Sequence, residues 1–411
     1  MTPAPSVDGW LSVHGGELVA LRRDLHAHPE LGNAEHRTTA LLVARLEASG
    51  LAPRVLRGGT GLVCDVGRGD GPVVGLRADL DALPLADEKD VPYRSTVPGA
   101  CHACGHDVHT AVVLGAGLAL AGLDLPGRVR LVFQPAEELM PGGALQVLDE
   151  GLVEGLDALY ALHCDPALEV GRLGVRPGAI TAAADMVQVR LTGPGGHTSR
   201  PHATVDLVQA LATVATGLPA ALSRLVDPRA GLALVWGHVG AGVAANAIPR
   251  EGLLRGTLRV LDRAAWESAP ALVRRVVEGL VAPYGAVADV TYTRGVPPVV
   301  NDADATARLA AAAREALGQG AVVPTAQSLG GEDFGWYLEK VPGSMARLGV
   351  RPPGSERSLD LHQGAFDVDE DAIAVGVRVL AAAALAALRD AATLRDAATL
   401  RGAGPEPRPT R

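Results

Sequence analysis

The segment CHACGHDVH, at positions 101–109, brings two cysteines and three histidines together. A redox pair of Cys101 and Cys104 would have to open a helix of a thioredoxin-like unit, which the flanking sequence does not resemble. Attachment of a c-type haem needs a histidine where the chain has Gly105. A structural zinc knuckle needs a second pair of nearby ligands, and none follows. The remaining interpretation is a metal-binding loop at the start of a helix, with Cys104 and His106 as ligands.

Three apolar segments typical of β-strands end in side chains that bind metals. VVGLRADLD ends with Asp79 and Asp81, RVRLVFQPAEE with Glu137 and Glu138, and LYALH with His163. In open α/β sheets, sites lie just beyond the carboxyl ends of the strands. Carboxylate, imidazole and thiolate together suit zinc or manganese, and the set is larger than one tetrahedral ion needs. We therefore expect two divalent ions, with one glutamate binding metal and its neighbour moving a proton.

The composition excludes several classes of protein. With 411 residues, 48% of them apolar, the chain is long enough for two domains with buried cores. A net charge of −9 argues against nucleic acid and anionic membranes as partners. Gly, Pro or charge interrupts each apolar run, so we expect no membrane span. The beginning of the sequence, MTPAPSVDGW, lacks the features of a signal peptide, which favours a cytoplasmic protein with cysteines as thiols or metal ligands.

The order of the predicted elements indicates an α/β protein with an insertion. Apolar strands alternate with helical patterns in the first part, which is typical of a mainly parallel sheet covered on both faces. From about residue 185 the order becomes β-α-β-β-α-β, which predicts an inserted ferredoxin-like domain. The predicted domains are a discontinuous catalytic domain, an insertion, and a helical extension with a flexible tail, at 1–184 plus 297–390, 185–296, and 391–411. The hexapeptide RDAATL, repeated at 389–394 and 395–400, belongs to the extension.

The motifs together resemble one enzyme family. They are RRDLHAHPELG, LRADLDALP, HACGHDVHTAVVLGAG, FQPAEE, ALHCDP, GGHTSRPH, ANAIP, GGEDF and LHQGAFDVDED. This series is similar to the metal-dependent amidohydrolases, in the branch of hippurate hydrolase, auxin-conjugate amidohydrolase and N-acyl-amino-acid deacylase, related to aminoacylase and bacterial carboxypeptidases. The resemblance extends from about residue 21 to 375. It implies hydrolysis of N-acyl amino acids, including aromatic-acyl ones, at a dinuclear centre of zinc or manganese, with cobalt or nickel also compatible.

The resemblance also implies roles for residues of the catalytic domain. The five implied metal ligands are Cys104, His106, Glu138, His163 and His362. Glu137 matches the general base that activates the attacking water. Asp81, or alternatively Asp79, matches the carboxylate that orients a ligand. Cys101 becomes a bystander, and His102 and His109 are expected to support ligands or cap the helix.

Further roles are implied for the inserted domain. His197, in GGHTSRPH, matches a histidine that holds the scissile carbonyl oxygen, in its own or a partner's active site. His202, Asn246 and Arg259 match contacts to the substrate, where an amide and a guanidinium suit a carboxylate. In related enzymes this domain mediates dimerisation, so we expect a homodimer or tetramer.

Three alternatives remain open at this point. A dipeptidase or carboxypeptidase would use the same centre on free peptides. A non-catalytic binding module would keep the fold with a single structural metal. A thiol-redox protein would depend on Cys101 as the resolving partner of Cys104.

Overall fold

The computed structural model describes residues 6–355 and 359–402, with side chains up to Arg395 in the last helix. The chain divides into two units. Unit 1 comprises Met1–Gly178, Asn301–Ala326 and Trp336–Arg411, and unit 2 comprises Ala179–Val300 and Gln327–Gly335. The predicted insertion, 185–296, falls inside unit 2, which is longer at both ends and includes a separate later segment.

The sheet of unit 1 has eight strands in the described part of the chain, in the order β1-β2-β4-β3-β5-β16-β6-β15. In that order, their bounds are Arg54–Val55, Leu62–Gly67, Arg128–Gln134, Val73–Asp79, Ala158–Glu169, Gly343–Arg351, Leu173–Val175 and Val322–Pro324. The central strands β4, β3, β5 and β16 are parallel, whereas β1 and β2 pair in antiparallel fashion. All seven residues of β3 are buried, as expected for a strand covered on both faces. This sheet confirms the predicted α/β class with a mainly parallel sheet.

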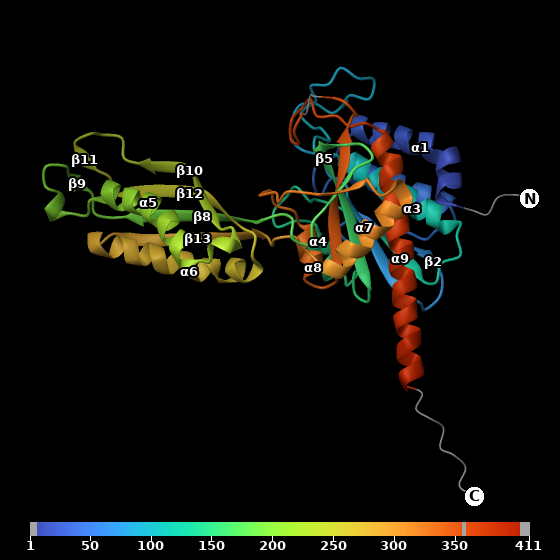
Figure 1. Cartoon of the computed structure of the whole chain (residues 1–411). Helices are drawn as coiled ribbons and strands as arrows, with labels where there is room; N and C mark the ends of the chain where they lie inside the picture. The colour runs from blue at the N-terminus through green and yellow to red at the C-terminus, as the bar shows by residue number, and fades with distance from the viewer. Residues whose placement is uncertain (1–5, 356–358, 403–411) are drawn as a thin grey trace, which may run out of the picture. The chain divides into compact units, whose positions relative to one another are not determined.

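Helices cover the sheet of unit 1. Their bounds are α1 (Val7–Ala27), α2 (His36–Ala48), α3 (His106–Ala121), α4 (Ala144–Asp149), α7 (Ala303–Leu317) and α9 (Asp371–Gly402), while α8 (Phe334–Leu338) spans the boundary at residue 335. The apolar helix α3 packs against α1 and α9 (Figure 1). A Cβ atom at Gly115 of α3 would lie 2.5 Å from Leu18 of α1 and 2.8 Å from Val377 of α9. Glycine at this position therefore allows the three helices to approach closely.

Helix α9 corrects one expectation. Its part Asp371–Arg395 contains an 18-residue window with a mean hydropathy of 1.9 and is long and apolar enough to cross a membrane, so the expectation that no apolar run reaches this length is wrong. However, 67% of that apolar window is buried inside the fold, where α9 packs against α3 and α7. These contacts explain its composition as that of a core helix. Both RDAATL copies lie on α9, and the part of the predicted tail after Gly402 lies outside the described residues.

Unit 2 contains an antiparallel sheet in the order β10-β12-β8-β13. Along the chain its main elements are β8 (Ala183–Thr192), α5 (Leu207–Leu225), β10 (Ala233–Ala241), β12 (Glu251–Val260), α6 (Arg263–Val281) and β13 (Val287–Val296). Helices α5 and α6 pack together along the strands (Figure 1). Two further pairs of short strands are β9 (Gly196–His197) with β11 (Ala247–Ile248), and β7 (Gly178–Ala179) with β14 (Val300–Asn301).

Candidate metal centre

The topology of unit 1 brings the predicted site residues to one edge of the sheet. Strand β3 runs parallel to both β4 and β5, so the carboxyl ends of these strands meet at the same edge. Asp79 ends β3, and Glu137 follows β4 by three residues. The loop before α3 brings Cys104 and His106 close to His163 at the same edge. Gly105 in this loop, with φ of 86°, adopts a left-handed conformation. A Cβ atom at Gly105 would lie 2.7 Å from the sulfur of Cys164, so only glycine fits.

The five predicted ligands and the predicted base form overlapping groups. In each group the potential ligand atoms lie within 4.8 Å of one another: Cys104, His106 and His163; Cys104, Glu138 and His362; His106, Glu137 and Glu138. Cys104 Sγ lies 3.6 Å from His163 Nε2, and Glu138 Oε1 lies 3.4 Å from His362 Nε2. Residues from four separate segments of the chain are thus assembled in one place.

The histidines present the same nitrogen to the site. The Nδ1 atom of His106 hydrogen-bonds to the carbonyl oxygen of Asp81 at 2.8 Å, and that of His163 to the carbonyl oxygen of Cys164 at 2.8 Å. These bonds leave Nε2 facing the other ligands. His106 Nε2 and Glu138 Oε1 are buried and have no hydrogen-bond partner among the described residues. A divalent cation would satisfy both atoms, so the residues fit the implied metals.

The electrostatics of the site also fit cations. The neighbouring Cys104 and Glu138 raise the pKa of His362 to about 10. Burial alone would lower the pKa of His106, but Asp79 and Cys104 raise it well above its usual value. The anionic groups of the site therefore attract positive charge. In contrast, burial and the nearby Arg347 lower the pKa of His163, which keeps it in the neutral form that binds metals.

Asp81 contacts the backbone of the two glutamates, and its Oδ1 also lies 3.4 Å from Nδ1 of His106. Its Oδ1 accepts a hydrogen bond from the backbone N–H of Glu137 at 3.0 Å, and its Oδ2 accepts one from that of Glu138 at 2.9 Å. Both carboxylate oxygens are thus engaged by the backbone that carries the predicted base and ligand. The orienting role that the resemblance implies for Asp81 stays a prediction.

Asp79 has a different set of partners. Its carboxylate accepts hydrogen bonds from Arg77 at 2.7 Å and from Nδ1 of His109 at 2.6 Å. Burial would raise the pKa of Asp79, but His106, His109 and Arg77 outweigh burial and hold it well below its usual range. The Nε2 of His109 accepts the N–H of Cys164 at 2.9 Å, so both ring nitrogens of His109 are used within the protein. Asp79 and His109 therefore brace the strand that carries His163.

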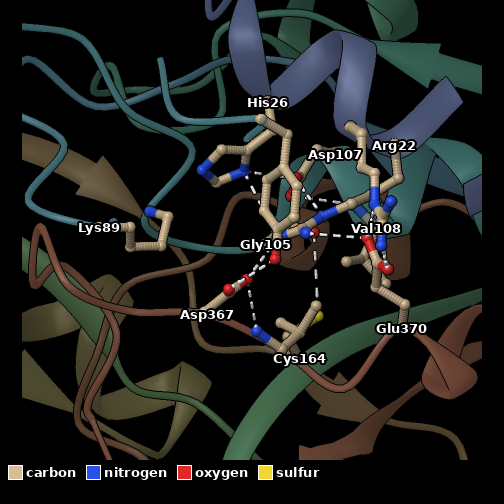
Figure 2. Close-up of polar contacts among 12 residues, drawn as sticks. Arg22, His26, Lys89, Gly105, Asp107, Val108, Cys164, Asp367 and Glu370 are labelled. Carbon is tan, nitrogen blue, oxygen red and sulfur yellow. Dashed lines mark hydrogen bonds and ion pairs between the residues drawn. The ribbon is translucent and has the colours of Figure 1, made fainter. Parts of the chain in front are cut away.

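A buried network of charged side chains next to the proposed ligands, shown in Figure 2, was not predicted from the sequence. Arg22 Nε donates to Asp107 at 2.8 Å, and His26 Nδ1 lies 2.7 Å from the same oxygen. Arg22 also donates to Asp367 at 2.9 Å and to Glu370 at 3.3 Å. The motif RRDLHAHPELG supplies Arg22 and His26, but the motif alone did not indicate these partners. The network joins α1 to the segment of His106 and to the segment that follows His362.

The remaining predicted residues lie in unit 2. His197 is exposed on β9, opposite Ala247 of β11, and Asn246 accepts a hydrogen bond from Thr198 at 3.3 Å. His202 lies in the short 3₁₀ helix Pro201–Ala203, and Arg259 on β12 donates to the carbonyl of Leu329. The structure brings His197 and Asn246 near one another within unit 2. The roles of all four residues stay predictions.

Comparison with known proteins identifies the family. The model of peptidase family M20/M25/M40 matches residues 75–386, so the chain belongs to this family. The resemblance to metal-dependent amidohydrolases is thereby confirmed. An N-acetylcysteine deacetylase of Bacillus subtilis is 38% identical over 379 residues, which cover 90% of this chain and 97% of that protein.

Two further relatives differ in how much of their length matches. The crystal structure of the Bacillus subtilis YXEP protein, described as a dinuclear metal-binding peptidase of the M20 family, has a TM-score of 0.81 and 34% identity, and the match covers 92% of this chain and 99% of that one. A Rhodococcus jostii protein named as a glutamate–cysteine ligase is 51% identical over 366 residues, or 89% of this chain. The match spans only 46% of the length of that relative.

Proposed function

We propose that the chain is a metal-dependent amidohydrolase that cleaves the amide bond of N-acyl amino acids. The observation that carries this proposal is the assembly of five ligand-type side chains around Cys104 and Glu138, with Glu137 beside them. Family membership and the name of the Bacillus deacetylase support amide hydrolysis. An apolar acyl group, including an aromatic one, is within the proposed substrate class.

Two divalent ions would be held by Cys104, His106, Glu138, His163 and His362. When bound, they supply polarisation of the substrate carbonyl and a lowered pKa of water. The thiolate favours zinc, while the carboxylate and imidazole ligands also admit manganese, cobalt or nickel.

Glu137 is the proposed general base. It is buried, its backbone is held by Asp81, and it belongs to the same group as His106 and Glu138. In this position its carboxylate takes a proton from the attacking water and then passes it to the leaving amine. Asp81 holds the backbone of Glu137 and so keeps the Glu137 carboxylate in place. Asp79 acts indirectly, through its hydrogen bond with His109.

Unit 2 is proposed to be a ferredoxin-like insertion that mediates assembly into a homodimer or tetramer. The element order and the antiparallel order β10-β12-β8-β13 support this proposal. We further propose that His197 stabilises the oxyanion, and that Asn246, Arg259 and His202 contact the substrate. We also propose a cytoplasmic location. The four free cysteines support this location, because disulfides are rare in the cytoplasm.

Glu137→Ala tests the catalytic role. Because general acid–base groups contribute about 10²- to 10⁴-fold, the variant should lose turnover by that factor while keeping its fold and its metal content. Elemental analysis, circular dichroism and kcat are measured beside Glu47→Ala, a control at an exposed position of α2. Retained turnover in Glu137→Ala would exclude the proposed base.

A substrate panel tests the proposed class. N-acetyl amino acids, hippurate and dipeptides are compared by kcat/KM on the wild-type protein. Preference for N-acyl amino acids is expected, whereas preference for dipeptides would favour the peptidase alternative. One tightly held ion without turnover would favour the binding module.

A further inference from the structure

Two acidic side chains hold three successive backbone N–H groups at the catalytic glutamates. The N–H groups of Glu137 and Glu138 donate to Asp81, as described above. The preceding N–H, of Ala136, donates to Glu35 Oε1 at 2.8 Å. Glu35 comes from the beginning of α2, about one hundred residues earlier in the chain. We propose that Glu35 is a positioning residue for the reaction, because it fixes the turn that presents Glu137 and Glu138 to the site.

The backbone at Ala136 needs such support. Ala136 has φ of 54°, in the left-handed region that residues other than glycine rarely adopt. Conformations of this kind persist only where the surroundings hold them, and they gather at functional sites. Here the N–H is held by Glu35, and the carbonyl accepts the N–H of Gly143 at 2.9 Å. A Cβ atom at Gly143 would lie 1.8 Å from the carbonyl oxygen of Pro135, so the turn is closely packed on that side as well.

Capping of α2 does not explain Glu35. Although Glu35 is the N-cap residue of α2, its side chain makes no capping hydrogen bond. Instead, Glu30 accepts the N–H groups of Arg37 and Thr38, each at 2.8 Å. Glu30, and not Glu35, therefore caps the N–H groups at the beginning of α2. The carboxyl group of Glu35 is turned toward Ala136.

Burial of the Glu35 carboxyl group is energetically costly. Glu35 is 0% exposed, and its Oε2 has no hydrogen-bond partner among the described residues. Burial raises the pKa of this carboxyl group. Leaving a buried polar atom without a partner is unfavourable, so an apolar residue would stabilise the fold more simply. The hydrogen bond to Ala136 at the active-site turn explains why an acidic residue is placed there.

The kinetic test rests on the proposed amidohydrolase function and compares two substitutions of similar volume. Glu35→Met removes the acceptor, whereas Glu35→Gln keeps an acceptor oxygen at the same reach. We expect Glu35→Met to lose about 10- to 100-fold in kcat, the range typical of residues that support catalytic groups, with little change in KM. Glu35→Gln should stay close to the wild-type kcat. Asp302→Ala is the control, since it removes a cap at Ala305 of α7, outside the site.

A second readout does not depend on turnover. Hydrogen exchange of the backbone amides at 136–138 is measured in the metal-free protein. Glu35→Met should speed exchange there, while Glu35→Gln and Asp302→Ala should not. If Glu35→Met does not fold, Glu35→Asp takes its place, because its shorter side chain withdraws the acceptor from Ala136.

The outcomes separate this proposal from the proposed function. Wild-type exchange at 136–138 in Glu35→Met, or equal losses of kcat in the Gln and Met variants, would overturn the positioning role. If the wild-type protein hydrolyses no substrate of the panel, the proposed function fails, and hydrogen exchange still decides the role of Glu35.

Discussion

The two cysteines of the CHACGHDVH segment have different neighbours. Cys104 lies within reach of the imidazoles of His163 and His362. Cys101 is instead fully buried beside Lys89, whose Nζ lies 3.5 Å from its sulfur. Burial raises the pKa of Cys101 to about 11, so its reactive thiolate form is disfavoured. The two cysteines therefore have separate environments.

Serine substitutions at Cys104 and Cys101 should differ strongly in their effect on metal content and activity. Cys104→Ser should reduce metal content and lower kcat/KM by more than about 100-fold, because even residues behind a ligand typically cost 10- to 100-fold. Cys101→Ser should change both quantities by less than roughly fivefold, equivalent to about 1 kcal/mol. Elemental analysis and steady-state kinetics measure the difference. Loss of activity in Cys101→Ser with full metal content would support the thiol-redox alternative.

Helix α1 contributes to the site through Arg22, whose side chain is almost fully buried. Its guanidinium group connects Asp107, next to the proposed ligand His106, with Asp367 and Glu370 (Figure 2). A planar guanidinium donates to several carboxylates at once, which a lysine ammonium group cannot do with the same geometry. The helix therefore connects the two segments that carry the proposed ligands His106 and His362.

Arg22→Lys should destabilise the protein although the charge is retained. Loss of a hydrogen bond between charged groups costs about 1.5–3 kcal/mol, so a reduction of about 2 kcal/mol in the free energy of unfolding is expected. Urea unfolding measures it. Arg23→Lys is the matched control, because Arg23 is half exposed and its pair with Glu370 is a surface ion pair worth about 0–1 kcal/mol. Equal destabilisation by the two substitutions would contradict this account of Arg22.

Across the chain, the buried strands and the acidic residues that follow them could be predicted from the sequence. Apolar runs such as β3 are recognisable by their composition, and acidic residues at strand ends meet because parallel strands share an edge. The contacts of Arg22 with Asp107 and of Glu35 with Ala136 join residues about one hundred positions apart, so no local periodicity reveals them. The left-handed turn at Ala136 likewise lacks the glycine that usually signals it. The apolar length of α9 was misjudged because Gly376 and Arg378 interrupt the apolar sequence without ending the helix.

Metal binding should stabilise one unit and not the other, because all five predicted ligands belong to unit 1. A ligand at 1,000 times its Kd stabilises the folded state by about 4 kcal/mol, so a chelator should lower the melting temperature of unit 1. Unit 2 contains Trp236 and Trp266.

Replacing Trp10 and Trp336 by phenylalanine leaves tryptophan fluorescence that reports on unit 2 alone. Calorimetry of the same variant follows both units, since chains of two units often unfold in more than one transition. With chelator, the calorimetric transition of unit 1 should move to lower temperature while the fluorescence transition stays in place. Re-addition of zinc or manganese should restore the first transition. An equal shift of both would contradict the assignment of every metal ligand to unit 1, because unit 2 would then have to gain stability from the same ions.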